Sequence, residues 1–260
     1  MNDPADHRRR RVLHGEGLAW PGRPAKTSPG VPRAKAVLFD IDGTLIDTGG
    51  AGARSWSWAF EHVHGVSADI AMSSSAGMTD PDVATRTFEA VLGRTPSDHE
   101  LARLFAWYVY RLQHEVAISE GYRVLDGVAE TLRRLMDLGI VLGIVSGGLE
   151  GSARIKLERG HLNRYFPVGA FGTDSRDRRE ITRVAIARVS MMHGRDIEPS
   201  DVIVVGDTPL DVDAAKAVGA TSLGVASGSY PVDELRRSGA DFVLASLEEP
   251  FPLTIDHDEP

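Results

Sequence analysis

Three short apolar segments of the sequence each run into polar residues that are suited to catalysis. The segments are 34–39, 140–145 and 202–205, and the polar residues that follow them are Asp40 and Asp42, Ser146 and Gly147, and Asp207 and Asp211. Carboxylates without Cys or His beside them favour Mg²⁺, which takes one or two carboxylates together with substrate phosphate. Glycine-rich turns expose backbone N–H groups that bind phosphate. The sequence therefore predicts magnesium-assisted phosphoryl chemistry on these residues.

Asp40 and Asp42 stand two residues apart, directly after the first apolar segment. At this spacing the two side chains can point the same way and still differ in reach. One carboxylate can attack phosphorus, which divides the transfer into two easier steps through an aspartyl-phosphate. The other can act first as an acid and then as a base. A metal ion and a basic residue would neutralise the charge of the transferring group.

The segments that position these residues alternate between strand and helix patterns. Apolar runs that predict buried parallel strands lie at 34–39, 140–145, 202–205, 220–225 and 242–244, with a weaker one at 165–171. Helical patterns lie between them at 128–138, 149–159, 181–192, 210–218 and 232–238. This order predicts an α/β fold with a mostly parallel sheet. Ligands of such sheets bind beyond the carboxyl ends of the strands, where the polar residues lie.

One long stretch interrupts the alternation. Residues 50–121 contain three helical patterns, at 54–64, 81–92 and 97–119, and no convincing strand. We expect an inserted all-helical cap domain there, because the stretch is too long for a connecting loop. The core domain would comprise 34–49 and 122–247. Residues 1–33, rich in Arg and Pro, and 248–260 are expected to be tails.

Composition excludes several classes of protein. The 260 residues carry a net charge of −8, which argues against binding of nucleic acid. The sequence has no run of 18 apolar residues, and so predicts no membrane span. There is no cysteine, which excludes disulfides and cysteine catalysis. We expect a cytoplasmic protein, monomeric or homodimeric, whose partner is a small phosphorylated metabolite.

The sequence 37–45, Val-Leu-Phe-Asp-Ile-Asp-Gly-Thr-Leu, resembles the first motif of the haloacid dehalogenase-like superfamily. Val145-Ser146-Gly147 resembles the second motif of that superfamily, and 206–211 resembles the fourth. The order and spacing resemble those of the branch that includes phosphoglycolate phosphatases and phosphoglucomutases. The resemblance implies a Rossmann-like core and a helical cap inserted after the first motif.

The resemblance also implies roles for individual residues. Asp40 would be the nucleophile and Asp42 the general acid/base, while Ser146 and Gly147 would bind the phosphoryl group. The implied ligands of Mg²⁺ are Asp40, Asp207, the backbone carbonyl of Asp42, and Asp211 in support.

The third motif departs from the family pattern. The family has a lysine before the helix that follows the third strand, but this chain has no lysine between residues 157 and 215. Our main candidate for the missing charge is Arg178, with Arg176 and Arg179 as alternatives. Lys156, two turns into the preceding helix, is another. Arginine keeps the charge but is larger and fork-shaped.

Within the family, the cap loop at 77–80 predicts that Thr79 and Asp80 contact the leaving group, although either could instead cap the next helix. Asp42 favours a phosphatase over a dehalogenase, which lacks that carboxylate. A sugar-phosphate mutase is an alternative, and it would need basic cap groups. The cap has five arginines, none of them in the 77–80 loop: Arg54, Arg86, Arg94, Arg103 and Arg111. A non-catalytic binding protein of the same fold is a further alternative, supported by the missing lysine. A two-component receiver domain is disfavoured by the long insertion.

Overall fold

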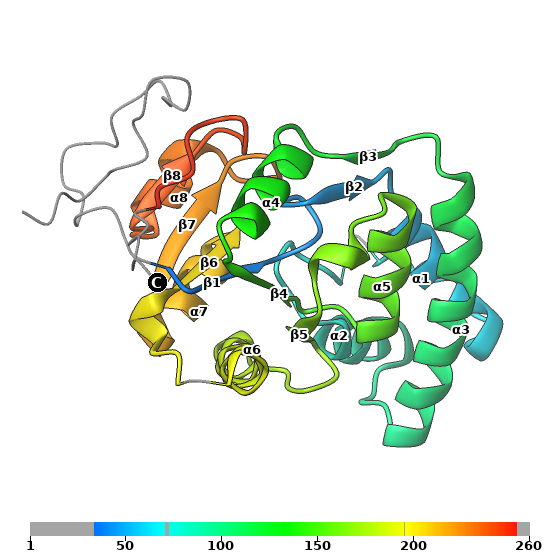
Figure 1. The fold of residues 1–260 in the computed structure, drawn as a ribbon. Helices are drawn as coiled ribbons and strands as arrows, with labels where there is room; N and C mark the ends of the chain where they lie inside the picture. Colours follow the sequence, from blue (N-terminus) through cyan, green and yellow to red (C-terminus); the bar gives the residue numbers. More distant parts are fainter. Residues whose placement is uncertain (1–33, 71–72, 195, 254–260) are drawn as a thin grey trace, which may run out of the picture.

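The apolar segments of the sequence form one parallel six-stranded sheet, in the order β5-β4-β1-β6-β7-β8 (Figure 1). The computed structural model describes residues 34–70, 73–194 and 196–253. The strands are β1 (Ala36–Phe39), β4 (Val141–Val145), β5 (Val168–Ala170), β6 (Val202–Gly206), β7 (Thr221–Val225) and β8 (Phe242–Leu244). Strand β1 lies in the middle of the sheet, with β4 and then β5 on one side and β6, β7 and β8 on the other. The carboxyl end of β1 is therefore a switch point, where α/β sheets bind ligands.

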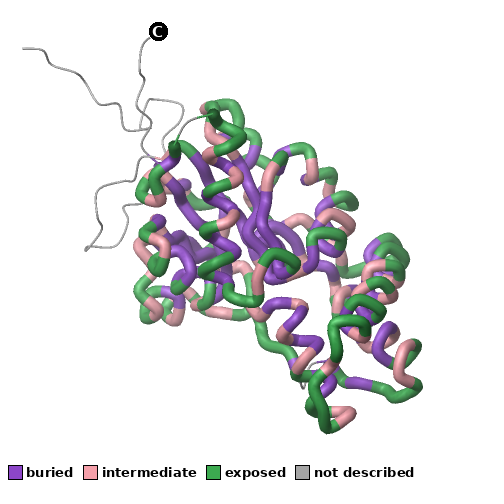
Figure 2. Tube along the Cα trace, turned by 90° about the horizontal axis from the view of Figure 1, so that it is seen from below, coloured by how far each residue is buried: buried purple, intermediate pink, exposed green. Residues whose placement is uncertain are grey.

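Both faces of the sheet are covered, as the continuous apolar runs predict. Alternate residues of β1 pack into different clusters, with Val37 and Phe39 on one face and Ala36 and Leu38 on the other. The tube in Figure 2 shows the strands as the buried centre of this domain. The helices that follow the strands are α4 (Val128–Asp137), α5 (Glu150–Arg159), α6 (Arg178–His193), α7 (Pro209–Val218) and α8 (Val232–Arg237). The predicted α/β class is confirmed.

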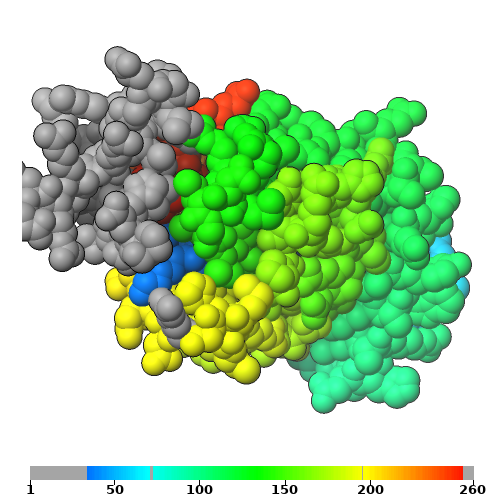
Figure 3. Space-filling model, viewed as in Figure 1, coloured from blue at the N-terminus to red at the C-terminus, as the bar shows by residue number. Residues whose placement is uncertain are grey.

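Three helices form a cap beside this core, α1 (Ala51–His64), α2 (Asp80–Leu92) and α3 (Asp98–Ile118). Their inner faces share an apolar cluster that includes Trp56, Phe60 and Phe88. Helix α3 begins at a capping box, in which Ser97 and Glu100 satisfy each other's backbone N–H groups. The helix also packs against α5 of the core, and the two surfaces meet in Figure 3.

The chain enters and leaves the cap through a short antiparallel ribbon that the sequence did not predict. Strand β2 (Ile46–Thr48) pairs with β3 (Tyr122–Val124). The hydroxyl of Ser119 donates a hydrogen bond to the carbonyl of Thr48 at 2.7 Å. A Cβ on Gly49 would lie 2.6 Å from Gly121, so the two crossing segments are in close contact. Three-residue strands are too short to show an alternating pattern.

The end of the described chain packs on the core. Phe251 and Leu253, in the segment expected to be a tail, are buried in the same cluster as Phe39. The rings of Phe39 and Phe251 have centroids 6.5 Å apart. The expected N-terminal tail at 1–33 lies outside the described residues. No helix within the described part of the chain is long and apolar enough to cross a membrane.

Candidate active site

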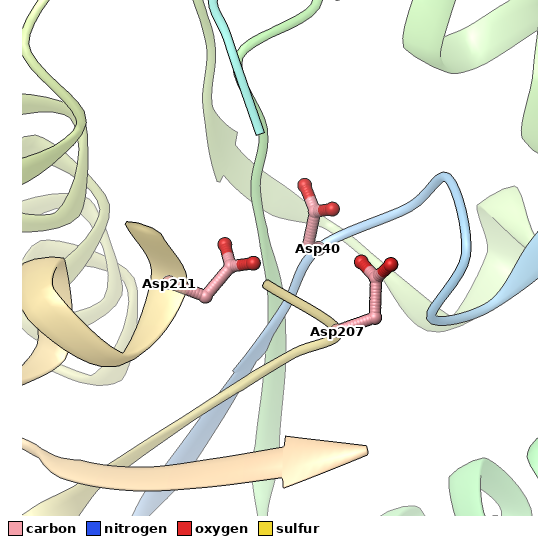
Figure 4. A group of neighbouring side chains, drawn as sticks. All are labelled: Asp40, Asp207 and Asp211. Carbon is pink, nitrogen blue, oxygen red and sulfur yellow. The ribbon is translucent and has the colours of Figure 1, made fainter. Parts of the chain in front are cut away.

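Three aspartates from different elements meet at the carboxyl edge of the sheet. Asp40 follows β1, Asp207 follows β6, and Asp211 lies in the first turn of α7. One oxygen of each carboxylate lies within 4.8 Å of the other two, and all three residues are buried. Figure 4 shows the carboxylates of Asp40 and Asp207 pointing the same way, with that of Asp211 directed toward them from the start of α7. Asp211 lies beside the other two because it forms a capping box with Thr208, which fixes the start of α7.

This group concentrates negative charge in a buried place. Burial raises the pKa of Asp40 well above its usual range; Arg178 opposes the shift, and the neighbouring aspartates add to it. Burial and the charge of Asp211 raise the pKa of Asp207 to about 7. Three carboxylates with one guanidinium beside them leave an uncompensated negative charge. Oxygen donors so arranged fit a hard divalent cation such as Mg²⁺, which would remove the repulsion.

Two glycines make room for the carboxylate of Asp207. A Cβ on Gly43 would lie 2.5 Å from its Oδ2, and a Cβ on Gly228 would lie 1.8 Å from the same atom. Thr44 donates a hydrogen bond to its Oδ1 at 3.3 Å. The loop after β7 closes the site further, since Ser227 donates a hydrogen bond to the carbonyl of Gly43 at 2.7 Å. The sequence motifs did not include this loop, although it follows a strand of the same sheet and so lies at the edge where ligands bind.

Arg178 supplies the positive charge beside Asp40. It is the first residue of α6, whose N-terminus is capped by Asp177, and its side chain is buried. One nitrogen, Nη2, lies 3.3 Å from Asp40 Oδ1 and also pairs with Asp211. Nη1 donates to the carbonyl of Gly77 in the cap at 3.2 Å. Its Nε is buried without a hydrogen-bond partner among the described residues.

Lys156 makes a different contact. Its ammonium donates a hydrogen bond to Asp42 Oδ2 at 2.6 Å. The carboxylate of Asp42 is thus paired with a basic residue and is not part of the group formed by Asp40, Asp207 and Asp211. The ammonium is buried, which lowers its pKa, but the charges of Asp42 and its neighbours outweigh burial and raise that pKa. The two candidates for the missing basic residue therefore contact different aspartates.

The turn after β4 brings Ser146 and Gly147 to the same edge. Ser146 is buried, and its hydroxyl accepts a hydrogen bond from the backbone N–H of Gly148 at 3.2 Å. Gly147 permits close approach of the cap, since a Cβ there would lie 2.5 Å from the carbonyl oxygen of Met78. The same Cβ would lie 3.1 Å from Nη1 of Arg178, which places this turn beside the basic side chain.

The 77–80 loop of the cap reaches this turn, but its side chains have structural partners. Thr79 is buried and caps α2, accepting a hydrogen bond from the backbone N–H of Asp82 at 3.4 Å. Asp80 accepts one from the backbone N–H of Leu149 at 2.8 Å, just before α5. Its own N–H donates to the carbonyl of Gly147 at 2.8 Å. The loop thus lies against the site: the side chain of Asp80 holds it to the core, and that of Thr79 caps α2 within the cap.

Known proteins resemble this chain over most of its length. A family model described as haloacid dehalogenase-like hydrolase matches residues 34–219. The phosphoglycolate phosphatase of Escherichia coli (strain K12) is 26% identical over 244 residues, which cover 86% of this chain and 94% of that protein. The phosphoglycolate phosphatase of Salmonella typhimurium is also 26% identical, over 247 residues and with the same coverage.

Solved structures share the fold at lower identity. A crystal structure described as a predicted phosphoglycolate phosphatase from Haemophilus somnus superposes with a TM-score of 0.65 at 18% identity, covering 84% of this chain and 96% of that one. A β-phosphoglucomutase from Clostridium difficile superposes with a TM-score of 0.64 at 20% identity, covering 82% and 92%. These two neighbours share one architecture and are described by different activities, so the fold alone does not choose between a phosphatase and a mutase.

Proposed function

Because the chain belongs to the haloacid dehalogenase-like hydrolases, we propose that it is a magnesium-dependent phosphatase for a small phosphorylated metabolite of the phosphoglycolate type. The observation that carries the proposal is the buried group of Asp40, Asp207 and Asp211 with Arg178 3.3 Å from Asp40. Carboxylates and a guanidinium in this arrangement can hold a divalent cation and a phosphoryl group together. The curated relatives named phosphoglycolate phosphatase support the substrate class.

In the proposed reaction, Asp40 attacks the phosphorus of the monoester. The bond between phosphorus and the leaving oxygen breaks as the bond to the Asp40 carboxylate forms, and Asp42 gives a proton to the leaving oxygen. Asp42 then takes a proton from the water that attacks the aspartyl-phosphate, which returns Asp40 and releases phosphate.

The charge of the phosphoryl group has protein partners in this scheme. Arg178 donates from a buried position that excludes competing water, where such hydrogen bonds are strong. Gly147 lies beside Arg178, and the hydroxyl of Ser146 and the backbone N–H of Gly147 would bind phosphoryl oxygens. Asp40, Asp207 and the carbonyl of Asp42 would hold Mg²⁺, with Asp211 in support; the ion would neutralise charge on the phosphoryl oxygens.

The cap favours a phosphatase over a mutase. A mutase needs free basic cap groups to hold a sugar bisphosphate, but three of the five cap arginines are paired with glutamates of the cap. Arg54 and Arg111 both bind Glu115, and Arg94 binds Glu100. The non-catalytic alternative rested on the missing lysine, and Arg178 supplies a positive charge beside Asp40.

The experiment is phosphate release from a panel of phosphorylated metabolites, with Mg²⁺ and with EDTA. The panel includes 2-phosphoglycolate, sugar phosphates and p-nitrophenyl phosphate, and the wild type is compared with Asp40→Asn. Release that needs Mg²⁺ and is lost in Asp40→Asn supports the proposal. Conversion of one sugar phosphate into its isomer, with no phosphate released from any compound, would instead identify a mutase.

A further inference from the structure

The ion pair between Lys156 and Asp42 lies at the seam between core and cap. The Lys156 side chain is 9% exposed and that of Asp42 is 49% exposed, so a buried cation holds a carboxylate that still meets solvent. The Nζ–Oδ2 distance of 2.6 Å is that of a charge-assisted hydrogen bond. A long lysine side chain is normally mobile and loses that freedom only where its surroundings fix it.

The surroundings of Lys156 come from both domains. On the core side, the Tyr122 hydroxyl donates to the backbone carbonyl of Lys156 at 2.8 Å, which braces this turn of α5. On the cap side, the charge of Asp80 acts on the ammonium and helps to raise its pKa, after the larger effect of Asp42. Tyr108 lies on α3, is 1% exposed, and is stacked on Trp56 with centroids 4.7 Å apart. The ammonium is therefore held in one place.

We propose that Lys156 is a positioning residue for Asp42, acting on the reaction through that carboxylate and not by binding the phosphoryl group. The contacts separate the two roles: Arg178 lies beside Asp40, where phosphorus is attacked, whereas Lys156 binds Asp42. The inference rests on the proposed function, in which Asp42 exchanges the proton. Because Lys156 binds Oδ2, the other oxygen, Oδ1, carries that proton. Lys156 itself stays protonated throughout.

If Lys156 positions Asp42, the rate lost on removing Lys156 should depend on how much the leaving group needs a proton. An alkyl ester such as 2-phosphoglycolate needs its leaving oxygen protonated, whereas p-nitrophenolate leaves without that help. Lys156→Met removes the ammonium and keeps the length of the side chain. We expect kcat for 2-phosphoglycolate to fall on the order of tenfold to hundredfold, a part of the 10²–10⁴-fold contribution of general acid catalysis. For p-nitrophenyl phosphate we expect a loss within about threefold, with KM unchanged for both esters.

Three further variants make the test specific. Lys156→Arg keeps a charged donor and should recover most of the lost rate, also where Lys156→Met folds poorly. Lys216→Met, at an exposed lysine of α7 that binds the carbonyl of Gly239, is the matched control and should behave as wild type. The double variant Asp42→Asn with Lys156→Met should be no slower than Asp42→Asn alone, because the two residues act as a unit.

Other results would overturn the role. Equal losses on both esters together with a raised KM would mean that Lys156 binds the phosphoryl group. If the rate loss of the double variant equals the product of the two single-variant losses, Lys156 acts independently of Asp42. An active wild type with an unchanged Lys156→Met variant rejects this role alone, whereas a wild type inactive on every ester rejects the proposed function and this role with it.

Discussion

Arg178 carries the only described positive charge within hydrogen-bond distance of Asp40, and its removal should have two separable effects. In Arg178→Ala, Asp40 and Asp211 lose their shared partner and stay buried. At 3.3 Å and an effective dielectric constant of about 20, the attraction between Arg178 and Asp40 alone is about 5 kcal/mol. Uptake of a proton by a carboxyl group limits the cost. We therefore expect unfolding free energy to fall by about 3–5 kcal/mol, the range for breaking one side of a buried pair.

This loss is measurable by thermal unfolding in EDTA. At about 2–4 °C per kcal/mol for a chain of this size, Tm should fall by roughly 6–20 °C. Mg²⁺ should restore part of the loss, because it neutralises the same carboxylates. Arg179→Ala, at the exposed neighbouring position, is the matched control and should leave Tm and turnover unchanged.

Turnover gives the second readout. Loss of one buried charged donor to the transition state should lower kcat/KM about 10²–10³-fold at saturating Mg²⁺. Arg178→Lys, which restores the residue usual in the family, should recover most of this loss, although it cannot donate to Asp40 and the Gly77 carbonyl with one planar group. Turnover of Arg178→Ala within about threefold of wild type, in a folded protein, would refute the assignment of Arg178.

Three more predictions follow from the site. Asp42→Asn should slow hydrolysis of 2-phosphoglycolate about 10²–10⁴-fold and hydrolysis of p-nitrophenyl phosphate much less. Equal losses of rate on the two esters would count against Asp42 as the general acid. Because the pKa of Asp207 is raised from 3.8 to about 7, the folded protein binds the proton more tightly, and stability without Mg²⁺ should fall by about 3 kcal/mol as pH rises from 4 to 7. Chemical unfolding in EDTA should show this fall, and Asp207→Asn should reduce the slope of unfolding free energy against pH. The same slope in that variant would show that Asp207 does not cause the fall. Gly228→Ala places a Cβ against Asp207 and should raise the Mg²⁺ concentration needed for half-maximal rate. Gly52→Ala, with open space around its Cβ, should not change that concentration. If both variants need the same Mg²⁺ concentration, the space at Gly228 does not position Asp207.

Much of the fold could be predicted from the sequence, because the signals were local and strong. Buried parallel strands need continuous apolar runs, and helix starts need caps, as Ser97 and Asp177 illustrate. The convergence of Asp40 and Asp207 followed from a topological rule, since carboxyl ends of parallel strands meet at one edge. The chain lacks the lysine of the third motif, and the basic residue at the start of the helix in that region is Arg178. The structure places Arg178 beside Asp40.

Other features depend on tertiary contacts that one sequence does not display. Lys156 of α5 reaches Asp42 in the turn after β1, a contact between distant parts of the chain that helical periodicity does not determine. The β2–β3 ribbon is stabilised by pairing across 70 residues of cap and not by its three-residue strands. The hydrogen bond of Asp80 to the N–H of Leu149 forms only when the cap lies against the core, whereas the cap that Thr79 makes on α2 is local and was foreseen as an alternative.

The central claim, an aspartyl-phosphate on Asp40, is tested most directly by trapping it. Wild type with Mg²⁺ and 2-phosphoglycolate is quenched in acid within one turnover and mapped by peptide mass spectrometry. We expect one added phosphoryl group on the peptide that contains Asp40, and none in Asp40→Asn, which should also release no phosphate. Phosphate release without an adduct at any quench time, together with turnover by Asp40→Asn, would contradict it.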